Sequence, residues 1–134
     1  MEQAARFDTL LVCGVPVLQW RGAATETAIR HCQQILQALA RHGYREVVLD
    51  LQQVALSAPQ GWQRFLRTLE KTLPSYLHAD VVLPVESQSE RYLKRIRVVP
   101  STALALSHLT RLPLASLQGA QVTHISWQEL RDEE

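Results

Sequence analysis

The side chains best suited to metal or nucleophilic chemistry in this 134-residue chain are its five histidines and two cysteines. No two histidines stand at the spacing of metal ligands; they are His31, His42, His78, His108 and His124. Cys13 lies in an apolar run and Cys32 on the apolar face of a predicted helix, where a small buried hydrophobe is the common role. We therefore expect two buried, inert thiols, no disulfide framework and no bound metal.

The sequence lacks the usual signatures of catalysis and of nucleotide binding. It has no glycine-rich phosphate loop, no Gly-x-Ser-x-Gly elbow and no close pair of carboxylates placed for acid–base work. We therefore expect no catalytic residues and no cofactor, and interpret the chain as non-enzymatic.

One segment has the chemistry of a binding site. Ser57-Ala58-Pro59-Gln60 is typical of a helix start, with Ser57 as N-cap and Gln60 where a capping-box partner belongs. Free backbone N–H groups there would attract an anion or a partner's carboxylate. Trp62 is in register with apolar Phe65, so it either packs in the core or, if it faces outward, anchors an interface. The side chains off this apolar stripe, which we expect to be exposed, are Gln63, Arg64 and Arg67.

Charge and hydropathy exclude two classes of partner. The net charge is +1, so no overall field attracts nucleic acid. The longest nearly apolar run, 10–18, contains Gly and Pro and is too short to span a bilayer. We expect no nucleic-acid partner, no membrane insertion and a cytoplasmic location. We interpret the single dense basic cluster as a solvated face of a short helix; its members are Arg91, Lys94, Arg95 and Arg97, with Tyr92.

Hydrophobic periodicity predicts the elements that position these side chains. β-rich segments 7–12 and 15–21 flank Gly14 and indicate either a hairpin or one strand with a bulge. One helical stripe runs from Thr25 to a stop at Gly43, and another from Gly61 to Pro74. The remaining predictions are strands at 46–51, 79–85, 98–99 and 122–127, a short helix at 89–97, and a helix at 102–109 capped by Ser101.

This order of elements resembles the STAS domain, a family that includes anti-sigma-factor antagonists. The sharpest likeness is Glu46-Val47-Val48-Leu49-Asp50-Leu51-Gln52-Gln53-Val54, which is similar to the family's apolar strand ending in Asp-Leu-x-x-Val. Gly61 and Trp62 match the glycine and apolar residue that close the family's Asp-Ser-Ser/Thr-Gly loop. The resemblance implies an α/β fold, with a mixed sheet of four to five strands and helices mainly on one face. It assigns 1–109 to a STAS-like domain and 110–134 to a C-terminal extension with an edge strand and a frayed end.

The resemblance also implies a function. Counting back from Gly61, the family's Asp falls on Ala58, its phosphorylatable Ser on Pro59 and its second hydroxyl residue on Gln60. Proline has no hydroxyl, so the family's phosphorylation switch cannot operate there; Ser57 as a displaced acceptor is an open alternative. The implied function is a bacterial partner-switching module that constitutively binds an anti-sigma factor or a kinase-like regulator. The family's partner surface maps onto Ser57, Ala58, Pro59, Gln60, Gly61, Trp62, Gln63, Arg64 and Arg67.

Two alternatives come from other classes of function. The first is a structural or adaptor subunit, such as a transporter-associated accessory domain or a homodimer. A stable dimer that buries Trp62 or the segment 110–134 would favour it. The second is a small enzyme or a nucleotide-binding domain that uses the helix starts as an anion site.

Overall fold

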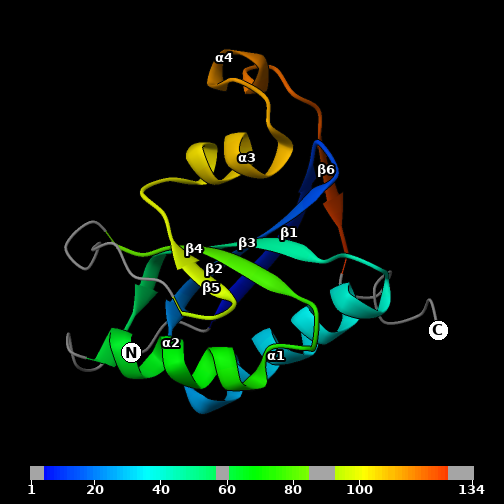
Figure 1. The fold of residues 1–134 in the computed structure, drawn as a ribbon. Coiled ribbons are helices and arrows are strands. Elements are labelled where there is room, and N and C mark those ends of the chain that lie inside the picture. The colour runs from blue at the N-terminus through cyan, green and yellow to red at the C-terminus, as the bar shows by residue number, and fades with distance from the viewer. Residues whose placement is uncertain (1–4, 57–60, 85–92, 127–134) are drawn as a thin grey trace.

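The computed structural model describes residues 5–56, 61–84 and 93–126, which form an α/β fold around one mixed sheet (Figure 1). The six strands lie in the order β5-β4-β3-β2-β1-β6. The mixed α/β fold is confirmed, but the expected four to five strands were too few. The strands are β1 (Arg6–Val12), β2 (Val15–Ala23), β3 (Glu46–Ala55), β4 (His78–Val82), β5 (Ile96–Val98) and β6 (Val122–Ile125). The helices are α1 (Glu26–Arg41), α2 (Gly61–Thr72), α3 (Thr102–Thr110) and α4 (Leu114–Leu117).

A two-residue turn joins β1 to β2. Cys13 and Gly14 have φ values of 51° and 81°, which define the type I′ turn whose twist matches that of a hairpin. The structure therefore has the predicted hairpin rather than one bulged strand. The tip of this turn is exposed, so the expectation that both cysteines are buried is wrong for Cys13.

The two long helices connect parallel strands. Thr25 caps α1, because its hydroxyl accepts a hydrogen bond from the backbone N–H of Ala28 at 3.1 Å. Gly43 follows the C-cap of α1 with a φ of 91°, a conformation that favours glycine. The connections β2–α1–β3 and β3–α2–β4 make β2, β3 and β4 parallel neighbours. The carboxyl ends of these strands therefore share one edge of the sheet, and α1 and α2 begin there.

The larger core lies between the sheet and these two helices. Trp20 is almost fully buried in it, with its ring centroid 5.7 Å from that of Phe65 on α2. Complete burial of one such aliphatic or aromatic side chain contributes about 1.5–3 kcal/mol to folding. The strand side chains that face these helices include Leu18, Val47, Leu49, Leu51, Ala79 and Val81.

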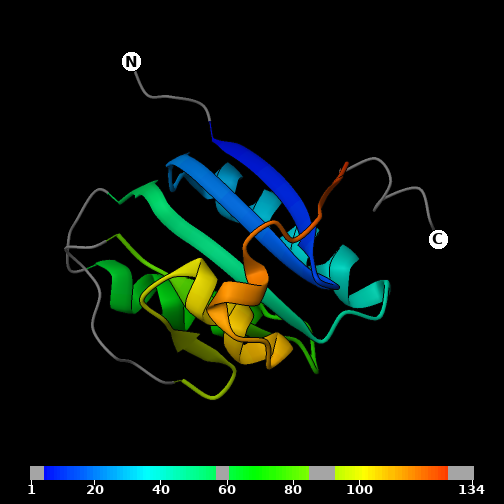
Figure 2. The same ribbon diagram turned by 90° about the horizontal axis from the view of Figure 1, so that it is seen from above.

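A smaller core occupies the opposite face of the sheet, beneath α3 (Figure 2). Strand alternation directs Val48, Val82 and Val99 to this face, where they pack with Ala105 and Leu106. The predicted cap of α3 is confirmed, because Ser101 Oγ accepts a hydrogen bond from the backbone N–H of Leu104 at 3.1 Å. Helices therefore lie on both faces, α1 and α2 on one and α3 and α4 on the other, rather than mainly on one face as expected (Figure 1).

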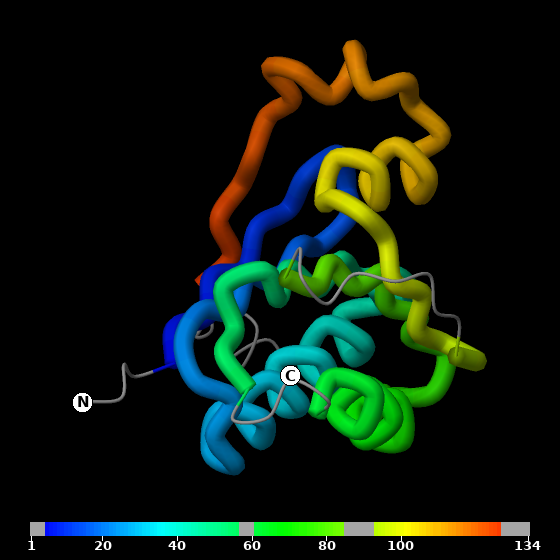
Figure 3. Tube along the Cα trace, turned by 90° about the vertical axis from the view of Figure 1, so that its left-hand side faces the viewer, coloured from blue at the N-terminus to red at the C-terminus, as the bar shows by residue number. Residues whose placement is uncertain are grey.

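The bounds of the two outermost strands, β5 and β6, differ from those predicted. The helix predicted at 89–97 is wrong at its end, where Ile96 and Arg97 enter β5 and pair in parallel with β4. Its first part, 89–92, lies outside the described residues, as does 85 at the end of the predicted strand 79–85. Figure 3 shows the chain arching away from the sheet through α3 and α4 and returning as β6. β6 is the predicted edge strand and pairs with β1.

Thiol labelling tests the different environments of the two cysteines. Burial raises the pKa of Cys32 to about 12, because desolvation disfavours the reactive thiolate. We expect a thiol reagent to modify one cysteine per native chain and both in denaturant. The variant Cys13→Asn, which keeps an Asn-Gly turn, should show no native labelling. Rapid native labelling of that variant would contradict this packing.

Candidate functional site

The surface predicted from the family resemblance lies where β3 leads into α2. Gly61 is the first residue of α2. Trp62 is only 5% exposed, and its ring meets that of Phe65 edge-on at a centroid distance of 5.4 Å. The core interpretation of Trp62 is therefore confirmed, and it offers no exposed anchor. Four of the predicted residues lie outside the described ranges: Ser57, Ala58, Pro59 and Gln60.

The exposed part of this region is defined here as the α2 surface, made of Gln63, Arg64 and Arg67. These positions alternate with the buried stripe of the helix, so their side chains project into solvent. Neither arginine forms an ion pair or hydrogen bond with another described residue. Both guanidinium groups therefore remain available to a partner's acceptors.

An apolar pocket of about 330 Å³ adjoins the α2 surface. It lies at the carboxyl edge of the sheet, where the backbone N–H of Ala24 donates to the carbonyl of Ala55 at 3.0 Å. Open α/β sheets commonly bind ligands at this edge. Arg64 belongs both to the α2 surface and to the pocket wall. The pocket is lined by Ala24, Ile29, Leu56, Gly61, Arg64, Phe65, Thr68 and Leu69.

The described lining of this pocket can bind both apolar and anionic groups. The described lining offers an apolar interior, one threonine hydroxyl and one guanidinium. An apolar side chain of a partner fits such a pocket, and an adjacent carboxylate would pair with Arg64. The described lining contains no histidine, cysteine or carboxylate that could serve as a base or nucleophile.

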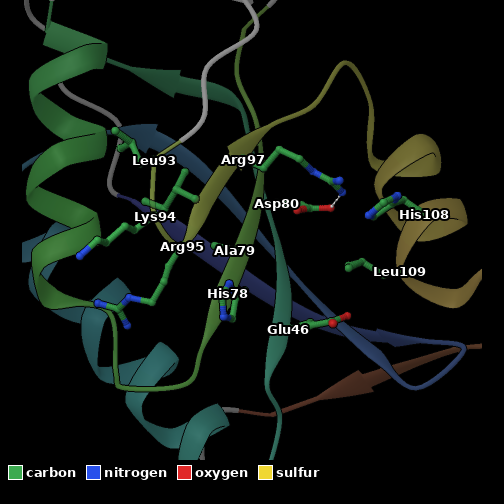
Figure 4. Close-up of a pocket in the computed structure, with 11 residues that line it drawn as sticks. Glu46, His78, Ala79, Asp80, Leu93, Lys94, Arg95, Arg97, His108 and Leu109 are labelled. Carbon is green, nitrogen blue, oxygen red and sulfur yellow. Dashed lines mark hydrogen bonds and ion pairs between the residues drawn. The ribbon is translucent and has the colours of Figure 1, made fainter.

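A second cluster lies at the amino edge of the parallel strands, on the α3 face (Figure 4). We call it the charged trough, and it borders a pocket of about 360 Å³. Strand pairing places Glu46 beside His78 and Asp80 beside Arg97. Figure 4 shows Arg97 extending from β5 toward His108 on α3, with Asp80 close by. The side chains that define the trough are Glu46, His78, Asp80, Arg97 and His108.

An ion pair forms the buried end of the trough. Arg97 Nη2 donates to Asp80 Oδ2 at 2.5 Å, and the two side chains are 25% and 9% exposed. Arg97 Nε is also buried and has no acceptor among the described residues. A carboxylate at this depth requires its partner, because an unpaired charge is costly to bury.

The neighbouring arginine has a structural role. The Arg95 guanidinium donates to the backbone carbonyls of Glu70, Leu73 and Pro74, at distances of 2.6–3.1 Å. The Glu70 carboxylate in turn accepts a hydrogen bond from the Arg95 backbone N–H at 2.9 Å. The predicted basic cluster is therefore not a solvated helix face where it is described. Of its members only Lys94 is fully exposed, while Arg91 and Tyr92 lie outside the described residues.

Sequence reasoning missed the charged trough, although the sequence contains a signal for it. Three strands carry the same pattern of a charged residue followed by two valines: Glu46-Val47-Val48, Asp80-Val81-Val82 and Arg97-Val98-Val99. In each, the second valine packs under α3, so the charged residue two positions earlier points to the same face. The pattern locates the charged residues, but only the strand register brings them together.

Two features are absent from the residues that the structure describes. Within the described ranges, no group of three or more His, Cys, Asp or Glu side chains could hold a metal ion. No helix in the same ranges is both long and apolar enough to cross a membrane.

Comparison with protein-family models and with curated proteins gives no match to this chain.

Three variants test the Asp80–Arg97 pair. We expect Asp80→Ala to lower the free energy of unfolding by about 2 kcal/mol, less than for a fully buried pair because Arg97 keeps some solvent contact. The double variant Asp80→Leu with Arg97→Met removes both charges and should be more stable than Asp80→Ala alone. Glu46→Ala, an exposed trough residue, is the control and should change stability by less than about 0.5 kcal/mol. Urea unfolding supplies the measurement, and equal stability of Asp80→Ala and Glu46→Ala would exclude a structural pair.

Proposed function

We propose that this chain is a non-catalytic protein-binding module whose partner contacts the α2 surface and the adjoining apolar pocket. The observation that carries the proposal is the position of Arg64. It has no ion-pair partner among the described residues, and it borders a pocket lined mainly by apolar side chains. Arginine beside an apolar pocket is typical of the centre of protein interfaces.

The chemistry of the site defines the partner's surface. Arg64 and Arg67 lie one helical turn apart, so they favour an acidic segment that can pair with both. The neighbouring pocket favours an apolar side chain on that segment. The expected partner is thus a protein with an acidic surface and one protruding hydrophobe.

The resemblance of the strand 46–54 to STAS domains places this proposal within partner switching. The order β1-β2-α1-β3-α2-β4 agrees with the order expected from that resemblance. An anti-sigma factor or a kinase-like regulator is the partner we propose. Because Pro59 cannot accept a phosphoryl group, phosphorylation at that position could not switch binding off, and binding would be constitutive.

Co-purification tests the α2 surface. The tagged chain is recovered from its native cell and compared with the double variant Arg64→Glu and Arg67→Glu, which repels an acidic partner. We expect the variant to lose one specific regulatory partner, with affinity falling at least tenfold. Circular dichroism and thermal unfolding check that the variant folds.

A matched control separates the surface from net charge. Arg45→Glu with Arg111→Glu makes the same charge change at exposed positions outside α2. This control should retain the partner. Equal loss from both double variants, or recovery of the same partner from both, would exclude the α2 surface as the binding site.

Filling the pocket gives an independent test. Thr68 is exposed and lines the pocket, so Thr68→Trp should occupy its volume while leaving both arginines in place. We expect weakened partner binding with unchanged thermal stability. Thr68→Ser, which keeps the hydroxyl and the open pocket, should bind as the wild type does. Unchanged affinity of Thr68→Trp, measured by titration calorimetry with the recovered partner, would remove the pocket from the interface.

A further inference from the structure

The outer edge of β6 is an unpaired strand edge. β6 forms a ladder with β1, and within the described part of the chain no strand pairs with its other side. Figure 2 shows β6 at the rim of the sheet. Such an edge presents a row of backbone donors and acceptors to a partner strand.

The register shows which backbone groups face outward. The two-residue turn makes Val12 and Val15 a hydrogen-bonded pair, so alternation along β1 directs the backbone groups of Leu11 toward β6. Leu11 lies opposite Thr123, and Thr123 therefore bonds inward. The N–H and C=O groups of its neighbours Val122 and His124 point away from the sheet.

The two edges of the sheet are protected to very different degrees. The other edge strand, β5, has three residues and carries Arg97, with exposed Lys94 just before it. Short length and positive charge are the usual protections of an edge. β6 is Val-Thr-His-Ile, which contains no Lys, Arg, Asp, Glu or Pro. Arg97 is already paired with Asp80, so exposed Lys94 is the charge that protects the β5 edge, and among the described residues β6 is the less protected of the two edges.

The surroundings of β6 favour a copy of the same chain over a charged partner. Between 98 and 126 the only formally charged side chain is Arg111. On β6 itself, Val122 is exposed and no side chain is formally charged. Two copies of this strand can therefore meet without like-charge repulsion, whereas an acidic or basic partner gains no ion pair from it.

We propose that two copies of this chain associate by antiparallel pairing of their β6 strands around a two-fold axis. Outward-bonding residues of one copy must pair with outward-bonding residues of the other, and a ladder centred on Thr123 is the register in which Val122 and His124 of both copies all pair within β6. Val122 of each copy then lies opposite His124 of the other, and each of these pairs exchanges its outward N–H and C=O groups. Because the axis is two-fold, each copy contributes the same β6 surface to the contact.

This pairing produces a closed dimer. A two-fold contact uses the β6 edge of both copies, so no β6 edge remains for a third copy. The pairing involves a part of the molecule other than the α2 surface, so the dimer leaves that surface open and either proposal can fail without the other. A confirmed dimer, because it buries part of 110–134, would also favour the structural or adaptor alternative.

Sedimentation at low to high micromolar concentration tests the association. We expect the mass to rise from 15.2 kDa toward twice that value. His124→Pro removes an outward N–H and leaves the inward ladder to β1 in place, so it should remain monomeric, whereas His124→Ala should still dimerise. A wild type that is monomeric throughout the range would overturn the proposal.

Cross-linking tests the register without relying on a proline variant. In a Cys13→Asn background, Thr123→Cys places two thiols opposite each other at a closely spaced pair, within disulfide reach. We expect mild oxidation to give a covalent dimer. Ser116→Cys, exposed on α4, is the control and should cross-link far less. Equal cross-linking at both positions would overturn this register.

Discussion

The burial of β3 on both faces is the constraint on which the rest of the structure depends. β3 lies between β2 and β4, with Val47, Leu49 and Leu51 facing the long helices and Val48 facing α3. A parallel strand of this kind needs cover on both sides, because each exposed face would leave apolar surface in water. The connections β2–α1–β3 and β3–α2–β4 supply one cover, and α3 supplies the other. With both faces covered, the polar side chains of this region lie at the two ends of the parallel strands.

The polar groups at the two ends of the parallel strands differ in whether they already have partners within the described residues. At the carboxyl ends of the strands, Arg64 and Arg67 have no ion pair with another described residue, and Arg64 lines an apolar pocket. At the amino edge, Asp80 and Arg97 are committed to each other, and Arg95 is fixed to backbone carbonyls. A partner can recruit the first set without breaking a native interaction, but not the second. This difference, more than any motif, favours α2 as the binding surface.

The sequence predicted the strongly periodic elements well, because local pattern alone specifies them. The hairpin around Gly14, the long helices and the Ser101 cap are of this kind. The strand predicted at 98–99 proved to be β5 at 96–98, and its start was assigned to a helix, because pairing with β4, a contact between segments distant in sequence, decides these residues. The charged trough was missed for the same reason, since strand register rather than spacing unites Asp80 with Arg97. The placement of Cys13 was wrong because an apolar run continued through the turn without indicating that its tip is exposed.

The most direct test of the central claim is hydrogen exchange of the chain alone and in complex with the partner recovered from its native cell. Backbone amides slow their exchange where a partner excludes water or suppresses local opening. The account predicts slower exchange on binding within 61–72 of α2, with β4 and β5 unchanged. Slower exchange confined to β4, β5 and α3, with α2 unchanged, would contradict it and assign recognition to the charged trough.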